Sequence, residues 1–219
     1  MMDHVERVRL KDRECLIWIT LPATWDEFMD PPTSEREIRE KYFTVKPGDV
    51  VVDVGASFGN YTLDGCLHGA KVYAFEPVPS RYEILARNVE LNNLDNCSLS
   101  NLGLWSKSGE ISLEDYAPHA DWRGKFKVTT LDEFVESNGI RRIDFIKIDT
   151  EGAEFEILNG CVNSMRRFRP KLLVEVHTFV DETLLPDVEN MLKGLGYTCE
   201  RIPRPPAVMV YGEVKRKLI

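Results

Sequence analysis

From residue 49 onward, short apolar runs alternate with longer stretches in which apolar residues recur at helical spacing. The runs are rich in Val, Ile and Leu, and their length is that of buried strands. Buried strands that alternate with helices are typical of a doubly wound, mostly parallel α/β sheet. We therefore expect strands near residues 49–54, 71–75, 97–101, 143–148, 171–176, 197–202 and 207–212.

The stretches between these strands carry the helical spacing. It predicts helices over residues 59–68, 79–92, 130–138, 152–167 and 181–194. The last two predicted strands are joined by a short Pro-rich turn, so they should form a hairpin that places an antiparallel strand in the sheet. The sequence thus predicts a seven-stranded Rossmann-like sheet with a C-terminal antiparallel hairpin.

Two further regions lie outside this regular pattern. Residues 5–21 alternate in polarity like one or two strands, and a charged helix follows from Glu35 to Phe43. Residues 103–129 form one long insertion, with short strands expected near 111–113 and 126–129. We expect an N-terminal appendage over residues 1–44 and a core over residues 45–219, and we expect the appendage and the insertion to build the pocket for a substrate.

The segment Val50–Thr62 is the most informative part of the chain. Its apolar run stops at Gly55, and a second glycine, Gly59, follows four residues later. This pattern predicts a buried strand that turns tightly into a helix and exposes backbone N–H groups at the turn. The next strand ends at Glu76, twenty-one positions beyond Gly55, where a carboxylate can accept hydrogen bonds from a ribose diol. The pattern indicates a cofactor that contains a nucleoside.

Motifs that are absent narrow the choice of cofactor. Dinucleotide sites use G-x-G-x-x-G, whereas the second glycine position here is Ser57, and the lysine of a phosphate-binding P-loop is missing. A ligand with a ribose and a positive centre but no phosphates fits better. S-adenosylmethionine is such a ligand, and Asp53 at the strand end could hold its ammonium group through a water or a backbone bridge. A plain strand–turn–helix corner without a ligand is the alternative.

Length and composition favour a single soluble domain of 219 residues. A formal net charge of −8 makes a nucleic-acid substrate unlikely, because affinity for nucleic acid comes mainly from Lys and Arg that neutralise phosphates. The sequence has five widely spaced cysteines without a C-x-x-C motif, which argues against a disulfide framework and a structural zinc site. It contains no apolar stretch long enough for a membrane span and no visible secretory signal. We therefore expect a cytoplasmic protein.

Several blocks of the sequence resemble the FkbM-type methyltransferases, a branch of the class I S-adenosylmethionine-dependent fold. The resemblance covers about residues 45–180 and is strongest in the block Ile143–Gly160, which reads IDFIKIDTEGAEFEILNG. Further matching segments are Asp53–Thr62, Phe75–Pro77, Thr130–Asp132 and Leu172–His177. The resemblance implies an O-methyltransferase that acts on a hydroxyl of a sugar, a polyketide or a similar small molecule.

In open α/β sheets, ligands lie beyond the carboxyl ends of the strands, so we expect the cofactor there. The turn at Gly55–Gly59 should approach the methionine part, Glu76 the ribose, and Asn101 with Leu102 the adenine, while Asp149 should lie near the reactive methyl group. Asn101 could instead cap a loop, and Glu76 could serve only as a charge at a helix N-terminus. The predicted cofactor-binding residues are Asp53, Gly55, Ala56, Ser57, Gly59, Asn60, Tyr61, Thr62, Glu76, Pro77, Asn101, Leu102 and Asp149.

Methyl transfer to an oxygen needs a base for the hydroxyl proton. The candidates are Asp149 at the end of the fourth strand and Glu175 with His177, whose i, i+2 spacing turns them to one face of the fifth strand. We favour His177, because the ordinary pKa of histidine, about 6.5, suits proton removal near neutrality. The same residues could instead bind a divalent metal ion, although nothing in the sequence supports one, and Glu175 could be purely structural.

The sequence favours an oxygen over a nitrogen as the atom that receives the methyl group. Enzymes that methylate exocyclic or amide nitrogens tend to carry an Asn/Asp-Pro-Pro-aromatic element after the fourth strand, and Asp149–Gly152 occupies that place. Two other functions remain as alternatives to an O-methyltransferase. One is an NAD-dependent oxidoreductase, and the other is a non-catalytic protein that binds S-adenosylmethionine.

Overall fold

The structure of the chain is a computed structural model that describes residues 4–19, 33–112 and 124–214. Residues 113–123, which include much of the expected insertion, lie outside the described residues. Contacts within the chain divide it into two compact units, residues 1–101 and residues 102–219. The two units are described in turn.

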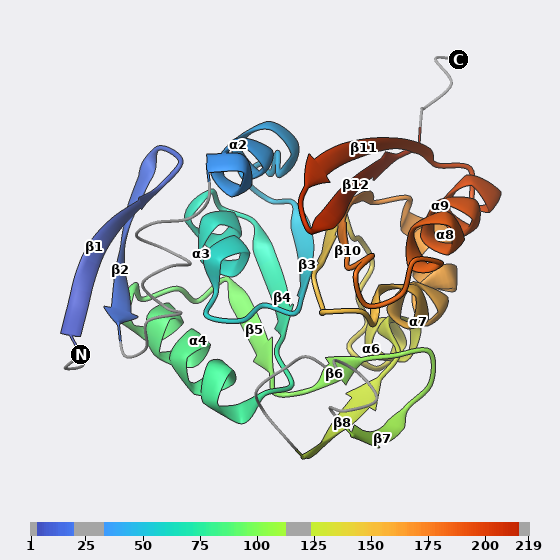
Figure 1. Cartoon of the computed structure of the whole chain (residues 1–219). Coiled ribbons are helices and arrows are strands. Elements are labelled where there is room, and N and C mark those ends of the chain that lie inside the picture. Colours follow the sequence, from blue (N-terminus) through green and yellow to red (C-terminus); the bar gives the residue numbers. More distant parts are fainter. Residues whose placement is uncertain (1–3, 20–32, 113–123, 215–219) are drawn as a thin grey trace. The chain divides into compact units, whose positions relative to one another are not determined.

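The first unit begins with an antiparallel hairpin and continues with alternating strands and helices (Figure 1). The hairpin is a separate two-stranded sheet, and the later strands run parallel in the order β3-β4-β5. The elements are β1 His4–Leu10, β2 Arg13–Ile19, α2 Thr33–Tyr42, β3 Val50–Val54, α3 Asn60–Leu67, β4 Lys71–Phe75, α4 Pro79–Leu91 and β5 Cys97–Ser100.

Buried amides attach the hairpin to helix α4. Asn88 accepts a hydrogen bond from the backbone N–H of Trp18 at 2.8 Å, and Asn92 both accepts from and donates to the backbone of Leu16 at 2.7 Å. Among the described strands only β1 pairs with β2, and these side chains satisfy backbone groups on the other edge of β2, which protects the edge of a short hairpin. The predicted N-terminal strands and charged helix are confirmed.

The second unit holds the remaining strands and helices. Within it the strands of the main sheet follow the order β11-β12-β10-β9, with β9 and β10 parallel and β12 antiparallel to both of its neighbours. The elements are β6 Gly103–Leu104, β7 Gly109–Ser112, β8 Lys125–Thr129, α6 Leu131–Ser137, β9 Phe145–Ile148, α7 Glu154–Asn159, α8 Val162–Phe168, β10 Lys171–Val176, α9 Leu184–Gly194, β11 Thr198–Arg204 and β12 Ala207–Glu213.

Seven of the described strands belong to the main sheet. It confirms the predicted α/β class, with mostly parallel strands and a C-terminal antiparallel hairpin. The short strands expected in the insertion are present as β7 and β8, which form a small sheet with β6. The described helices include none that is long and apolar enough to cross a membrane.

One predicted helix, residues 152–167, is wrong, because the structure has two helices there, α7 and α8. Helix α7 ends before Gly160. A Cβ atom at this glycine would lie 2.0 Å from the backbone oxygen of Trp105, so only glycine fits there. Asp132 then caps the second helix, since its carboxylate accepts hydrogen bonds from the N–H of Asn163 at 3.0 Å and of Ser164 at 2.7 Å. A capping carboxylate of this kind starts a new helix at α8.

Candidate functional site

The turn that follows β3 is shaped by three residues with positive φ angles. Gly55 has a φ of 72°, Ser57 of 49° and Gly59 of 105°. The N–H groups of Gly55 and Ala56 both donate to the backbone oxygen of Phe75 at 3.0 Å, which closes the turn against the end of β4. The left-handed conformation explains the glycines, because residues with a Cβ adopt it at a cost.

Glu76 ties this turn to the next one. Its carboxylate accepts hydrogen bonds from the N–H of Ser57 at 2.8 Å and from the N–H of Val78, at the start of α4, at 2.9 Å. The side chain is buried, with 3% of its surface exposed. The carboxylate therefore has a fixed orientation, and a carboxylate oxygen can accept more than one hydrogen bond. The carboxylate can therefore accept hydrogen bonds from a ribose diol, and it can equally serve only to hold the two turns together.

The predicted adenine contacts are placed at the end of β5. The side-chain amide of Asn101 donates to the backbone oxygens of Glu76 at 2.9 Å and of Pro77 at 3.1 Å. Pro77 is buried, whereas Asn101 is exposed and Leu102, the first residue of the second unit, is half-buried. The Asn101 amide thus holds the backbone at Glu76 and Pro77 in place, which agrees with the alternative that Asn101 caps a loop. A contact between Asn101 and adenine stays a prediction.

Other predicted cofactor residues are packed inside the first unit. Asp53 is fully buried and accepts a hydrogen bond from the hydroxyl of Thr62 at 2.6 Å, while Tyr61 packs edge-on against Phe43. Asn60 is held by the guanidinium of Arg39 in helix α2. Arg39 is 3% exposed, so this residue of the charged helix reaches the segment predicted to bind the cofactor. Gly55 and Ser57 are the half-buried residues of the segment, so a ligand would meet them first.

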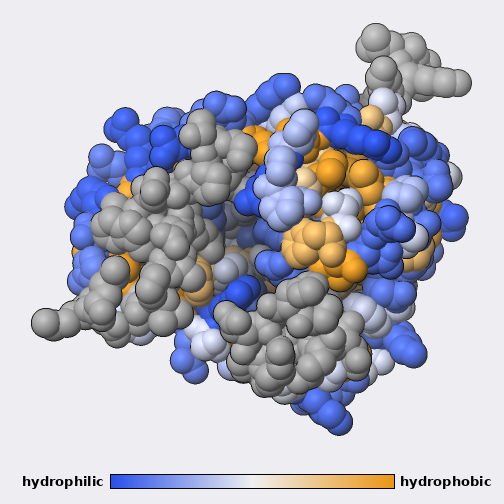
Figure 2. Space-filling model, in the orientation of Figure 1, coloured by the Kyte–Doolittle hydropathy of each residue, from blue (hydrophilic) through white to orange (hydrophobic). Residues whose placement is uncertain are grey.

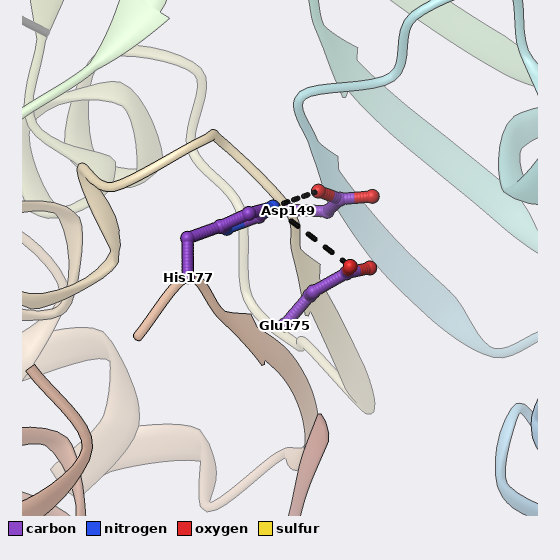
Figure 3. A group of neighbouring side chains, drawn as sticks. All are labelled: Asp149, Glu175 and His177. Carbon is purple, nitrogen blue, oxygen red and sulfur yellow. Dashed lines mark ion pairs between the residues drawn. The ribbon is translucent and has the colours of Figure 1, made fainter. Parts of the chain in front are cut away.

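In the second unit, the structure brings the three predicted catalytic residues together (Figure 3). Asp149 directly follows β9, Glu175 lies in β10 and His177 directly follows β10. The Nε2 atom of His177 is 3.7 Å from Oδ1 of Asp149 and 3.8 Å from Oε1 of Glu175. Glu175 and His177 are buried, while Asp149 is half-buried. The fold of this unit therefore places all three on one side, as their positions at the strand ends predict.

The sequence did not predict the partner of the other ring nitrogen. Nδ1 of His177 lies 2.8 Å from Oε1 of Glu154, a fully buried residue at the start of α7. The same oxygen accepts a hydrogen bond from the N–H of Gly152 at 3.0 Å. Because a carboxylate only accepts, Nδ1 carries the proton in this bond. Glu154 thus orients the imidazole and directs Nε2 towards Asp149 and Glu175.

Charged side chains surround this group. Nζ of Lys147 is 3.5 Å from Oδ2 of Asp149, and Arg204 in β11 bonds to Oε1 of Glu175. Glu151 contributes another carboxylate oxygen 3.6 Å from Nε2 of His177. Lys147, inside an apolar strand, thus pairs with an acid, whereas the pairing of Arg204 with Glu175 depends on the final hairpin.

These charges change the pKa of the imidazole. Burial lowers the pKa of His177, but the hydrogen bond to Glu154 and the negative charges of Asp149, Glu154 and Glu151 outweigh burial and raise the pKa to about 9. Burial opposes the ionisation of Asp149, yet Lys147, His177 and Arg204 hold the pKa of Asp149 below its ordinary value. The premise that His177 has an ordinary pKa is therefore wrong, and its imidazole is protonated near neutrality.

An exposed aromatic ring lies beside this group. Phe179 is 47% exposed and packs edge-on against the ring of His177, with 5.6 Å between the ring centroids. In Figure 2 apolar residues reach the surface of the second unit, around the region where Figure 1 draws β10 and β12. A large exposed apolar side chain next to charged groups is a common feature of binding surfaces for organic ligands.

Comparison with known proteins gives a family match over most of the chain. The sequence model of the methyltransferase FkbM domain matches residues 53–199. The hexuronic acid methyltransferase AglP of Haloferax volcanii is 33% identical over 141 residues, which are 61% of this chain and 58% of AglP. The 31-O-demethyl-FK506 methyltransferase FkbM of Streptomyces tacrolimicus is 26% identical over 70% of this chain and 74% of its own length. The chain thus spans little more than half the length of AglP.

Solved structures share the fold. The methyltransferase FkbM of Methylobacillus flagellatus KT superposes with a TM-score of 0.64 at 20% identity, over 88% of this chain and 50% of that one. TYW2 of M. jannaschii, solved in complex with AdoMet, superposes with a TM-score of 0.53 at 14% identity, over 98% of this chain and 87% of that one. At these identities the likeness supports the class I methyltransferase fold alone.

Proposed function

Because the chain belongs to the family of FkbM-domain methyltransferases, we propose that it is an S-adenosylmethionine-dependent O-methyltransferase. The acceptor is a hydroxyl of a small molecule, and a sugar is the favoured class because AglP acts on a hexuronic acid. The observation that carries the proposal is the buried carboxylate of Glu76, which two backbone N–H groups hold at the end of β4 within the family segment.

The first unit has the residues to hold the cofactor. Glu76 accepts hydrogen bonds from the ribose, the turn around Gly55 and Ser57 faces the methionine part, and Asn101 keeps the chain around Glu76 in place. The missing phosphate motifs and the missing second glycine favour this ligand over a dinucleotide. When bound, S-adenosylmethionine supplies an electrophilic methyl group, which moves to the acceptor oxygen while the electron pair of the broken carbon–sulfur bond stays on sulfur.

The second unit has the residues to act on the acceptor. The hydroxyl must lose its proton as the new bond forms, and the carboxylates of Asp149 and Glu175 can accept it. His177, whose pKa is raised to about 9, acts as a base only after it has lost its own second proton, and all three residues can instead serve as ligands of a cation. Phe179 offers an apolar face to the ring of the acceptor. Positioning of the hydroxyl contributes most of the rate, since in-line displacement depends on the alignment of the reacting atoms.

The experiment that tests this proposal measures binding and turnover separately. Calorimetric titrations with S-adenosylmethionine and with NAD decide the cofactor, and the proposal expects binding of S-adenosylmethionine alone. The formation of S-adenosylhomocysteine is then followed with a glucuronoside and with 31-O-demethyl-FK506 as acceptors. Binding of NAD would favour the oxidoreductase, and cofactor binding without turnover on any hydroxylated acceptor would favour a non-catalytic protein.

A further inference from the structure

The Nε2 atom of His177 is surrounded by carboxylate oxygens that do not form hydrogen bonds with it. Three carboxylates, those of Asp149, Glu151 and Glu175, lie 3.6–3.8 Å from Nε2 of one buried imidazole. These distances exceed the length of a hydrogen bond. Nε2 therefore points into a group of oxygens without bonding directly to any of these three. Because the pKa of His177 is raised to about 9, Nε2 carries a proton near neutrality, and a cation that binds there displaces this proton.

We propose that Asp149, Glu175 and His177 bind a divalent cation of the Mg²⁺ or Mn²⁺ kind, which holds the acceptor hydroxyl. One donor atom from each residue lies within 4.8 Å of the other two. Two donors that each lie about 2.1 Å from one ion are about 3.0 Å apart at a right angle and about 3.4 Å apart at a tetrahedral angle. The distances of 3.7 and 3.8 Å from Nε2 to the two carboxylate oxygens would shorten by about 0.3–0.8 Å, and the distance between those two oxygens, which is within 4.8 Å, by at most about 1.8 Å.

The second ring nitrogen of His177 supports the same conclusion. Histidines that bind metals usually donate the other N–H to a carboxylate, which fixes the ring. Glu154 provides this bond at 2.8 Å and is itself held by the N–H of Gly152 at 3.0 Å. The imidazole is only 4% exposed, so its orientation is set by these contacts before any ligand arrives.

The charges of the surrounding residues leave room for a dication. Four carboxylates lie within 4 Å of the His177 ring nitrogens, and the permanent cations Lys147 and Arg204 compensate for two of them. Lys147 pairs with Oδ2 of Asp149 and leaves Oδ1 facing His177. Arg204 bonds to Oε1 of Glu175, the oxygen that faces His177, so Glu175 would share this oxygen between Arg204 and the cation. Hard oxygen donors with one imidazole suit Mg²⁺ or Mn²⁺ better than a soft metal.

A cation at this position would have a defined task. It would bind the hydroxyl oxygen of the acceptor and lower the pKa of that hydroxyl, as divalent ions do for bound water. This catalytic role rests on the function proposed above, but the binding of the cation does not. The two can therefore be tested apart.

The test is a titration of the full chain with MnCl₂, followed by the electron paramagnetic resonance signal of free Mn²⁺, without cofactor or acceptor. The proposal expects one class of site, with affinity lowered about tenfold or more in Asp149→Asn and His177→Ala, and about tenfold in Glu154→Gln. Asp144→Asn is the control, because Asp144 precedes β9 and pairs with Arg142 at 2.7 Å. Its affinity should equal that of the wild type.

Circular dichroism and urea unfolding check that each variant is folded, and Glu175→Gln replaces any variant that is not. No Mn²⁺ binding by the wild type, or equal binding by wild type, Asp149→Asn and His177→Ala, would overturn the metal site. Methyl transfer that persists in EDTA would overturn the catalytic role of the cation and leave the methyltransferase in place. Bound Mn²⁺ without any methyl transfer would uphold the site and count against the proposed function.

Discussion

The candidate cofactor residues of the first unit and the Asp–Glu–His group of the second unit differ in what holds their charged groups in place. Around Glu76, the carboxylate is held by backbone N–H groups at 2.8–2.9 Å, so the main chain defines the geometry. Around His177, charged side chains face one another at 3.6–3.8 Å. In the first region the main chain fixes the carboxylate, whereas in the second Glu154 fixes the imidazole at 2.8 Å and three further carboxylates face its Nε2 atom.

This difference predicts that the two regions fail in different ways when they are mutated. A change in the first region should affect the fold or the affinity for the cofactor. A change in the second region should affect turnover and leave the cofactor bound.

The largest effect is expected for His177→Ala. Loss of the imidazole removes either the base or a ligand of the cation, so kcat should fall by about 10²- to 10⁴-fold. The dissociation constant of S-adenosylmethionine should stay within about twofold of the wild type, because every residue assigned to ribose binding lies in the first unit. His4→Ala, on the N-terminal hairpin, is the control for the loss of a histidine. Normal turnover in His177→Ala at every pH would remove the residue from the site.

Gly59→Ala tests whether the main chain defines the first region. A Cβ atom there would lie 2.7 Å from Cδ1 of Leu85, and φ is +105°. Strain and overpacking together should lower the free energy of unfolding by about 2–4 kcal/mol in a urea titration.

Gly48→Ala separates the two causes of this loss. Gly48 also has a positive φ, +83°, but nothing lies within 4 Å of its added Cβ atom. Only the backbone cost, about 1–2 kcal/mol, should remain. Equal losses in both variants would mean that the contact with Leu85 carries no energy.

Glu76→Ala should weaken the binding of S-adenosylmethionine. Loss of hydrogen bonds to a charged group costs about 1.5–3 kcal/mol, which is about 10- to 150-fold in the dissociation constant. Calorimetry measures it, with Glu83→Ala on the exposed face of α4 as the control. An unchanged dissociation constant in a folded Glu76→Ala protein would leave Glu76 with only its structural role, which is to join the turns at Ser57 and Val78.

Much of the first region can be predicted from the sequence because short local motifs mark its residues, although the hydrogen bond from Ser57 to Glu76 itself spans 19 residues. The apolar run before Gly55, the two glycines and the acid at the end of the next strand each specify a short segment. In contrast, the bond between Glu154 and His177 spans 23 residues, and that between Arg204 and Glu175 spans 29. Such residues meet only in the folded chain, where α7 packs against β10 and β12 joins β11 to β10.

The end of helix α7 at Gly160 also depends on contacts that sequence patterns do not reveal. Helical spacing continues through residues 152–167, but the close approach of the backbone at Trp105 and the carboxylate of Asp132 end one helix and start another. Both contacts come from segments that are distant in the sequence. The premise about the pKa of His177 was wrong for the same reason, because the three carboxylates that raise this pKa lie in residues 149–154, a segment distant from His177 in the sequence.

The smallest effect is expected for Phe179→Ala. Loss of its apolar face should raise KM for a ring-shaped acceptor by about three- to tenfold, which corresponds to about 1 kcal/mol of buried area, and should leave cofactor binding unchanged. Val5→Ala on the N-terminal hairpin is the control, because Val5 is equally exposed at 47%. An unchanged KM would place the acceptor away from Phe179.

The central claim is that the first unit binds the cofactor and the second acts on the acceptor. Side-by-side calorimetric titrations of S-adenosylmethionine into the wild type, Glu76→Ala and His177→Ala test this claim most directly. The account predicts a dissociation constant that rises about tenfold or more in Glu76→Ala and stays within about twofold in His177→Ala. An unchanged constant in Glu76→Ala, or an equal rise in both folded variants, would contradict it.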